Sequence, residues 1–157
     1  MLWNSGRQHP EPLRVSHACS RQRKSPTLWN GRLWTDKSGE FKGLFNVKLL
    51  GWAPLVMNVR ILAVNLALPA TGTLARLQLL EAARSLAPAT TAALSEAYHV
   101  LTRHRILLQI RCRRGEVQDS YHLDPLALDK DEREELRQAL VGIEELQNVI
   151  RTNFSIL

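Results

Sequence analysis

Residues 130–154 carry the feature that most constrains the fold, an apolar face that repeats with the period of an α-helix. Apolar side chains recur there every three or four residues, and charged or polar residues fill the positions between them. The apolar face consists of Leu136, Ala139, Leu140, Ile143, Leu146, Ile150 and Phe154. A helix with such a stripe owes most of its stability to tertiary packing, so the chain must supply elements that cover it.

Two further helical segments lie earlier in the chain, over about residues 52–67 and 73–86. Pro54 stands in the first turn of the first segment, where its missing amide hydrogen is harmless, and Pro69 follows the end of that segment. Leucines at every third position share one face of the second segment, and we expect Pro88 to end it.

A third helix is predicted over about residues 91–114, with Gly115 as its C-terminal stop. Its apolar stripe comprises Leu94, Tyr98, Leu101 and Leu108, with Ala97, Val100 and Leu107 alongside. Short turns that contain Pro, Gly or Asp join the four segments. The predicted fold class is therefore mainly α, an antiparallel four-helix bundle-like domain.

Residues 27–50 have the character of strands. Aromatic and branched side chains flank a polar turn, Asp36-Lys37-Ser38-Gly39, and this pattern predicts a small N-terminal β-hairpin. A lone hairpin is marginal in water, so it must pack on the helices. Hairpin and helices together make up one predicted domain, residues 27–157.

Residues 1–26 are basic, rich in Ser, Pro and His, and lack any periodicity. We predict a disordered leader, with an organellar transit peptide as the alternative. Residues 1–50 carry nine Lys or Arg against three acids, whereas residues 51–157 carry twelve of each. The net charge of +6 therefore belongs to the N-terminal third of the chain.

The most apolar stretch, residues 49–70, is long enough to raise the question of a membrane helix. Arg60 stands at its middle with Asn58 and Asn65 nearby, and an Arg at the bilayer centre costs roughly 2.5 kcal/mol or more. We therefore expect a buried helix of a soluble protein and no membrane partner.

The cysteines and histidines do not have metal-binding spacing. Cys19 and Cys112 are far apart and belong to no Cys-x-x-Cys motif, while His99 and His104 are five residues apart and point to different sides of the third helix. We predict no metal site and no disulfide framework, which is consistent with a reducing cytoplasm.

An Asp-x-Asp pair, Asp129 and Asp131, resembles the pairs that hold catalytic magnesium in nucleotidyltransferases. The Gly-Ser turn that would hold a triphosphate does not precede it; the nearest upstream glycine is Gly115, followed by Glu116. Glu132, three residues after Asp129, instead completes the pattern of a helix capping box. We predict that Asp129 caps the last helix and that the chain has no catalytic residues.

A run of arginines on the third helix could bind phosphate or nucleic acid. Residues 116–135, however, hold eight acids and two bases, so we favour pairing of the arginines within the fold. Arg105 falls on the apolar stripe and requires a buried partner or a ligand pocket. Arg60 is either part of a core salt bridge or one of a pair of cations that face an anionic substrate. The run comprises Arg103, Arg105, Arg111, Arg113 and Arg114.

Four motifs in the same order resemble one known family. They are "LWNGRLWTDKSGEFKGLFNVKLLGWAPLVMNVRILAV", "TGTLARLQLL", "LSEAYHVLTRHRILLQI" and "SYHLDPLALDKDEREELRQALVGIEELQNVI". Together they cover about residues 28–154 and resemble the nucleotidyltransferase substrate-binding domain. That domain forms the C-terminal part of bacterial signal-transduction proteins that carry, upstream, a cyclic-nucleotide-binding module, paired CBS domains and a nucleotidyltransferase-like domain.

The resemblance implies a substrate-binding surface built from residues that recur in the family. Here these are Lys48, Arg60, Tyr98, Arg103, Arg105 and Gln109. Thr73-Leu74-Ala75-Arg76-Leu77 and Asp124-Pro125 also match family motifs. Three positions depart from the pattern, because Asn46 and Met57 stand where the family commonly has acids and Leu108 where it has a His. A pocket built from those groups would be depleted here.

The resemblance further implies a non-catalytic accessory domain of a protein uridylyl- or adenylyltransferase-like signalling protein, as a truncated or split copy. It implies no cofactor in this chain, because Mg²⁺ and a nucleoside triphosphate belong to the missing transferase domain. The expected partners are a nucleotidyltransferase/CBS module, in cis or in trans, and a regulatory protein substrate, with no nucleic acid. The alternatives are a basic protein- or RNA-interaction bundle, whose binding would depend steeply on salt, and a purely structural remnant.

Overall fold

A computed structural model describes residues 28–29 and 32–153. The elements are β1 (Leu28–Trp29), β2 (Arg32–Leu33), β3 (Phe45–Asn46), the π-helix η1 (Lys48–Trp52), α1 (Ala53–Asn65), α2 (Thr73–Ala82), α3 (Pro88–Arg113), β4 (His122–Leu123) and α4 (Lys130–Asn153). The predicted mainly helical fold with a small hairpin is confirmed. The predicted leader and Phe154 lie outside the described residues.

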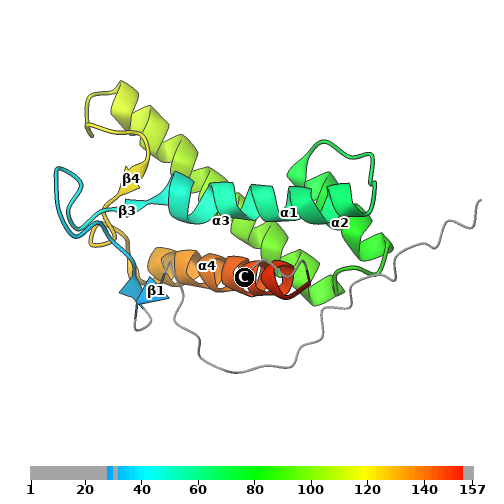
Figure 1. Cartoon of the computed structure of the whole chain (residues 1–157). Helices are drawn as coiled ribbons and strands as arrows, with labels where there is room; N and C mark the ends of the chain where they lie inside the picture. Colours follow the sequence, from blue (N-terminus) through cyan, green and yellow to red (C-terminus); the bar gives the residue numbers. More distant parts are fainter. Residues whose placement is uncertain (1–27, 30–31, 154–157) are drawn as a thin grey trace, which may run out of the picture.

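The helices α3 and α4 form the central pair of the fold. They run in opposite directions and cross obliquely, while α1 packs against α4, η1 packs against both α3 and α4, and α2 lies between α1 and α3 at one end of the fold (Figure 1). The strands gather at the opposite end, beside the start of α4 and the last turns of α3 (Figure 1).

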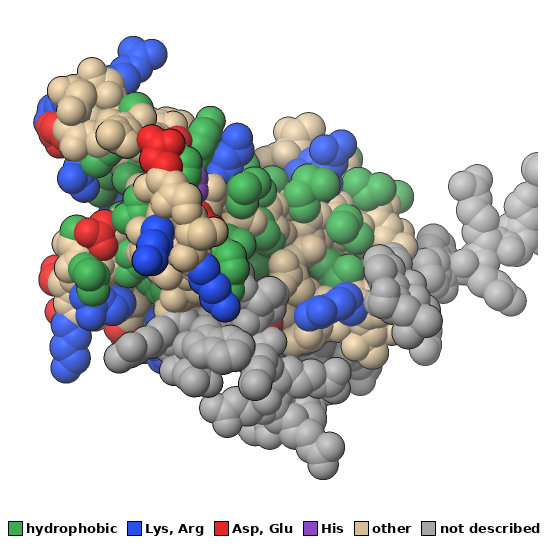
Figure 2. All heavy atoms as spheres, turned by 60° about the vertical axis from the view of Figure 1, so that its left-hand side comes forward, with side chains coloured by type: hydrophobic (Ala, Val, Ile, Leu, Met, Phe, Trp, Pro, Cys, Tyr) green, Lys and Arg blue, Asp and Glu red, His purple; other side chains and the backbone are tan. Residues whose placement is uncertain are grey.

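Charged side chains are unevenly distributed over the surface. From Phe41 to Leu80 the chain contains no Asp or Glu, whereas α4 carries acids along much of its length. Figure 2 shows the consequence: acidic side chains lie mainly at the left, and hydrophobic side chains with a few basic ones spread across the upper right, at the height of α1.

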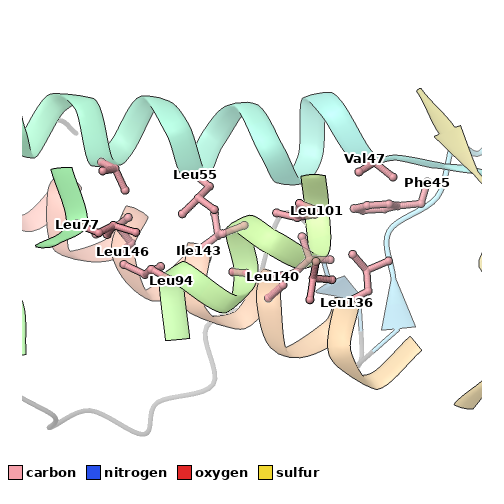
Figure 3. Packing of buried hydrophobic residues seen from close by; sticks show 14 of the residues in the cluster. Phe45, Val47, Leu55, Leu77, Leu94, Leu101, Leu136, Leu140, Ile143 and Leu146 are labelled. Atoms are coloured by element: carbon pink, nitrogen blue, oxygen red, sulfur yellow. The ribbon is translucent and has the colours of Figure 1, made fainter. Parts of the chain in front are cut away.

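The core is a layer of aliphatic side chains between α1, α3 and α4 (Figure 3). The predicted face of α4 is buried at every described position, because it packs against both neighbouring helices. The predicted stripe of α3 is buried except for Tyr98, which is half-buried, and Leu107, which is exposed. Our assignment of Leu107 to the packed face was wrong, because the Leu107 side chain faces solvent.

The chain becomes helical earlier than the sequence predicts. Residues 48–50, which we assigned to the hairpin, already belong to η1, and η1 runs directly into α1. Gly51 makes this path possible, because a Cβ atom at its position would lie 2.6 Å from Leu101 Cδ2 in the core. The absence of a side chain at Gly51 therefore lets η1 pack closely on α3.

The strands pair differently from the predicted hairpin. The observed hairpin is tight, with β1 antiparallel to β2, whereas β3 pairs antiparallel with β4, in the loop that precedes α4. Residues 36–44 form a loop of their own, closed by bonds from Asp36 N–H to Leu44 O (3.0 Å) and from Gly43 N–H to Asp36 O (2.8 Å). The second predicted strand is thus real, but its partner comes from a distant part of the sequence.

Two helix ends also differ from the prediction. The helix α2 ends at Ala82, because Arg84 adopts a positive φ of 57° and Ser85 N–H closes the end by donating to Leu80 O. Pro88 begins α3 instead of ending α2, since its fixed φ suits the first helical turn.

Within the described residues, none of the helices combines the length and the apolar character that crossing a bilayer requires.

Candidate functional site

One of the predicted site residues, Arg105, contacts Trp52 where η1 packs on α3. The guanidinium carbon of Arg105 lies 3.9 Å from the centroid of the Trp52 ring, and the indole Nε1–H of Trp52 donates to Thr102 Oγ1 over 3.2 Å. The sequence predicts that Arg105 needs a buried partner or a ligand pocket. The partner is the aromatic face of Trp52, which stabilises the positive charge in place of a carboxylate.

Lys48 lies one helical turn before Trp52 and is held in a similar way. Its Nζ sits 4.5 Å from the centroid of the Tyr121 ring. In the described part of the chain neither Lys48 nor Arg105 forms an ion pair with an acid. Two cations are therefore placed on aromatic rings, with their charges not neutralised by the fold.

Four polar or aromatic positions of α3 continue this surface along the helix. Tyr98, Thr102, Arg105 and Gln109 follow one another at intervals of three or four residues and so share one side of α3. Tyr98 is half-buried against the core, and Gln109 is exposed without a side-chain partner in the described chain.

The other two predicted residues point elsewhere. Arg103 forms an ion pair of 2.5 Å with Glu135 of α4, which places it on the side of α3 that faces that helix. Arg60 is exposed on α1 and has no side-chain partner among the described residues. The structure thus places Arg105 on Trp52 and Lys48 on Tyr121, with Tyr98 and Gln109 on the same side of α3 as Arg105, and it directs Arg103 to α4.

The remaining arginines of the run end α3 and are largely paired. Arg111 and Arg114 lie 3.4 Å and 3.8 Å from Glu116, and Arg113 is exposed without a partner among the described residues. Pairing within the fold, which the sequence favours, is therefore confirmed for Arg103, Arg111 and Arg114.

The Asp-x-Asp pair stands at the start of α4. Glu132 N–H donates to Asp129 Oδ1 over 2.8 Å, and Asp129 N–H donates to Glu132 Oε2 over 3.1 Å. This reciprocal pair is the predicted capping box. Among the residues that the structure describes, no three His, Cys, Asp or Glu side chains stand close enough together to hold a metal ion.

A cleft of about 300 Å³ opens between the 36–44 loop, the end of α3 and the loop before α4. Sequence reasoning missed it, because these three segments are far apart in the chain. Its lining residues include Glu40, Phe41, Arg111, Asp119, His122 and Asp124.

His122 anchors one wall of this cleft. Asn46 Oδ1 accepts from Leu49 N–H over 2.9 Å, and Asn46 Nδ2 lies 3.1 Å from His122 Nε2. The same Nε2 lies 3.5 Å from Asp36 Oδ2, and His122 Nδ1 lies 2.5 Å from Asp119 Oδ2. Phe41 stacks on the ring at 3.9 Å.

An imidazole oriented by a carboxylate has the arrangement of a general base. Here Nε2, the atom that would take a proton, is already occupied by Asn46, and the ring is covered by Phe41. The group therefore links β3 and β4, because His122 bonds to Asn46 of β3 and to Asp119 in the loop before β4.

Asp119 is the ionised partner of His122. Burial alone would raise the pKa of its carboxyl, but hydrogen bonds from the His122 side chain and from the backbone N–H groups of Tyr121 and His122 outweigh burial and lower it. The pKa of the Asp119 carboxyl therefore lies below the ordinary range of an aspartate, and the group remains ionised in acid that would protonate an ordinary aspartate.

His104, which the sequence raised only as a possible metal ligand, is a buried titratable group. It is buried in α3, and its Nε2 has no hydrogen-bond partner among the described residues. Burial lowers its pKa, Arg103 adds to the effect, and Glu132 and Glu135 oppose it. The imidazole is therefore held neutral inside the core.

The three departures from the family pattern do not meet in one pocket. Asn46 faces His122, Leu108 is buried in the core, and Met57 is exposed on α1.

The comparisons with known proteins agree with the resemblance found in the sequence. A family model described as "Putative nucleotidyltransferase substrate binding domain" matches residues 14–154. The searches of curated proteins and of solved structures gave no match.

Proposed function

The chain belongs to the nucleotidyltransferase substrate-binding domain family, and we propose that it is a non-catalytic accessory domain that holds a substrate for a separate nucleotidyltransferase module. The module, in cis or in trans, supplies Mg²⁺, the nucleoside triphosphate and the transfer chemistry. The substrate is a regulatory protein that receives a uridylyl or adenylyl group.

The observation that carries this proposal is that two cations are held on aromatic rings. Arg103, Arg111, Arg114 and Arg137 all pair with glutamates, whereas Lys48 and Arg105 rest on aromatic rings. A cation on an aromatic face keeps its charge available to an incoming anion, and the planar guanidinium can bind a carboxylate with two hydrogen bonds. The surface around Trp52 therefore suits an acidic segment of a protein substrate.

The contacts of the acidic and histidine side chains support the proposal that the transfer chemistry comes from the separate module. The carboxylates of the Asp-x-Asp pair stand at a helix N-terminus, where Asp129 satisfies a backbone N–H group, and His122 is committed to Asn46 and Asp119. The described residues thus contain candidates for binding an anion, and the two groups that resemble catalytic ones serve the fold.

Reconstitution with a transferase module tests the proposal. A family protein that carries CBS and nucleotidyltransferase domains, deprived of its own C-terminal domain, is mixed with this chain, a radiolabelled nucleoside triphosphate, Mg²⁺ and a regulatory protein of the signalling class. We expect label on the regulatory protein only when this chain is present.

Variants of the surface then locate the substrate contact. Arg105→Leu and Lys48→Met should raise the KM for the regulatory protein about tenfold or more, whereas Arg113→Leu, at an exposed unpaired arginine, should leave it unchanged. Transfer that does not need this chain, or that ignores both variants, would contradict the proposal.

A further inference from the structure

The Nε2 atom of His122 has two neighbours with opposite hydrogen-bonding requirements. Asn46 Nδ2 lies 3.1 Å from it and Asp36 Oδ2 lies 3.5 Å from it. Asn46 Oδ1 already accepts from Leu49 N–H, which leaves the Nδ2 donor facing the ring. A donor needs an unprotonated Nε2, whereas a carboxylate needs an N–H group there. The presence or absence of a proton on Nε2 therefore selects which neighbour the ring bonds.

The Nδ1 atom of His122 has the same partner in both cases. It lies 2.5 Å from Asp119 Oδ2, which also accepts from the backbone N–H groups of Tyr121 and His122 over 2.9 Å each. These bonds lower the pKa of the Asp119 carboxyl although burial would raise it. An ionised carboxylate can only accept, so a hydrogen bond here requires a proton on Nδ1. A neutral ring then carries its single proton on Nδ1, and Nε2 is the atom that gains the second.

The 36–44 loop supplies both contacts that a second proton would strengthen. It projects from the end of the fold that carries β3 and β4 (Figure 1). Asp36 is half-buried at its base, and Phe41 stacks on the imidazole with 3.9 Å between the ring centroids. An aromatic face attracts a cation, and a carboxylate pairs with one. A positive ring therefore gains attraction to Asp36 and Phe41 and loses the hydrogen bond from Asn46.

The other charged groups around the ring line the cleft. They are Glu40 of the loop, Asp124 of the loop before α4, and Arg111 near the end of α3. Arg111 lies 3.4 Å from Glu116. Among the residues that line the cleft the single cation is thus paired, so a positive imidazole is surrounded mainly by carboxylates.

We propose that His122 is a pH-sensitive switch for the 36–44 loop. The neutral ring accepts from Asn46 and leaves Asp36 without a bond to it. In weak acid, the range in which imidazoles take up a proton, the charged ring donates from Nε2 to Asp36 and fixes the loop to β4.

The switch acts on the cleft, because its two partners belong to different walls. Glu40 and Phe41 of the loop line one wall, whereas Asp119 and His122 line the other. A bond between Asp36 and the ring therefore restrains the movement of one wall relative to the other. The inference is independent of the proposed function, since it concerns the cleft and not the cations that rest on aromatic rings.

Nitrogen NMR of the imidazole in the full chain tests the exchange of partners. Long-range ¹H–¹⁵N spectra between pH 5 and pH 8 report which ring nitrogen of His122 carries a proton. We expect a proton on Nδ1 alone at pH 8 and on both nitrogens at pH 5. A neutral ring with its proton on Nε2 would overturn the proposal, and so would a ring that keeps one charge state throughout.

Hydrogen exchange of the Gly43 amide tests the effect on the loop, because this amide donates to Asp36 O within it. After correction for the intrinsic exchange rate, we expect protection to be about fivefold or more greater at pH 5.5 than at pH 8. Asp36→Asn should abolish the difference. The matched control Glu40→Gln removes one charge from an exposed residue of the same loop and should retain it. Equal behaviour of the two variants would contradict the switch.

Asn46→Asp tests the other partner of the ring. It keeps an oxygen that can accept from Leu49 N–H, and it adds a carboxylate beside Nε2, so the ring should stay charged to a pH about one unit higher or more. An unchanged titration of the ring would show that Asn46 is not its partner. Circular dichroism verifies that each variant is folded.

An alternative response of Asn46 has its own signature. If its side chain turned Oδ1 toward the charged ring, Leu49 N–H would lose its acceptor. Exchange of the Leu49 amide that is faster at pH 5.5 than at pH 8, after the same correction, would therefore overturn the transfer of the bond to Asp36. An unchanged Leu49 amide together with a protected Gly43 amide would support it.

Discussion

Arg105 stacks its guanidinium on the Trp52 ring, with 3.9 Å between the guanidinium carbon and the ring centroid. The contact joins two segments that are more than fifty residues apart and uses a charged side chain where the helical pattern calls for an apolar one. Arg105 is half-buried there, and its Nε is buried without a hydrogen-bond partner among the described residues, so the Trp52 ring stabilises a charge that the fold partly withdraws from water.

A double-mutant cycle between Trp52→Leu and Arg105→Leu measures this contact. We expect a coupling free energy of about 0.5–2 kcal/mol, because the guanidinium is partly desolvated over the ring. Urea unfolding followed by circular dichroism gives the four stabilities. Strict additivity of the two substitutions would show that the stacking contributes nothing to folding.

Two glycines in helical segments should respond to alanine in opposite directions. Gly51→Ala places a Cβ 2.6 Å from Leu101 Cδ2 in the core and should lower the free energy of unfolding by about 1–3 kcal/mol. Gly142→Ala on α4 meets Leu94 at 3.9 Å, an ordinary contact, and should raise it by about 0.5–1 kcal/mol. Thermal unfolding of both variants distinguishes the effect of close packing at Gly51 from the effect of backbone entropy at Gly142. An equal effect of the two substitutions would contradict the close packing of η1 on α3 at Gly51.

His104 should make the fold sensitive to mild acid. Its folded pKa lies below 6.5, so below about pH 6.5 the unfolded chain binds more protons than the folded chain, and stability falls as the pH falls. His104→Leu should remove this part of the pH dependence and should not destabilise the protein at pH 8, since the buried Nε2 has no partner in the described chain. Urea unfolding between pH 5 and pH 8 tests both statements. An unchanged slope in the variant would assign the pH dependence to another group.

The stability of the fold should depend on the hydrogen bond that Asp129 accepts at the start of α4 more than on the charge of Asp129. Asp129→Ala should lower the free energy of unfolding by about 0.5–2 kcal/mol, because Glu132 N–H loses its acceptor. Asp129→Asn retains an oxygen acceptor and should lower it by clearly less. Hydrogen exchange of the amides in the first turn of α4 localises the effect, and equal losses in the two variants would contradict the capping role.

The sequence predicts the helices well because each one is specified by local signals. The periodic apolar face of α4 and the capping box at Asp129 are readable within a few residues, and the structure contains both. The start of α3 was misassigned because Pro88 can end one helix or begin the next, and only the positive φ of Arg84 shows that α2 has already ended.

The pairing of β3 with β4 could not be read from the sequence. Phe45 and Leu123 are partners although 77 positions separate them, and a strand of two residues carries almost no pattern of its own. The buried state of His104 has the same origin, because it depends on how α3 meets α4. The resemblance indicated Arg105 and Lys48, whereas Trp52 and Tyr121, the aromatic rings on which they rest, became evident only from the packing.

The most direct test of the account compares nucleotide transfer by the chain alone and by the chain with the transferase module, for the wild type and for Asp129→Asn/Asp131→Asn. That double variant keeps a side-chain acceptor at the cap and removes both carboxylates that could bind Mg²⁺. We predict no transfer by the chain alone and equal transfer by the two forms in the presence of the module. Transfer by the wild-type chain alone that disappears in the double variant would contradict the account.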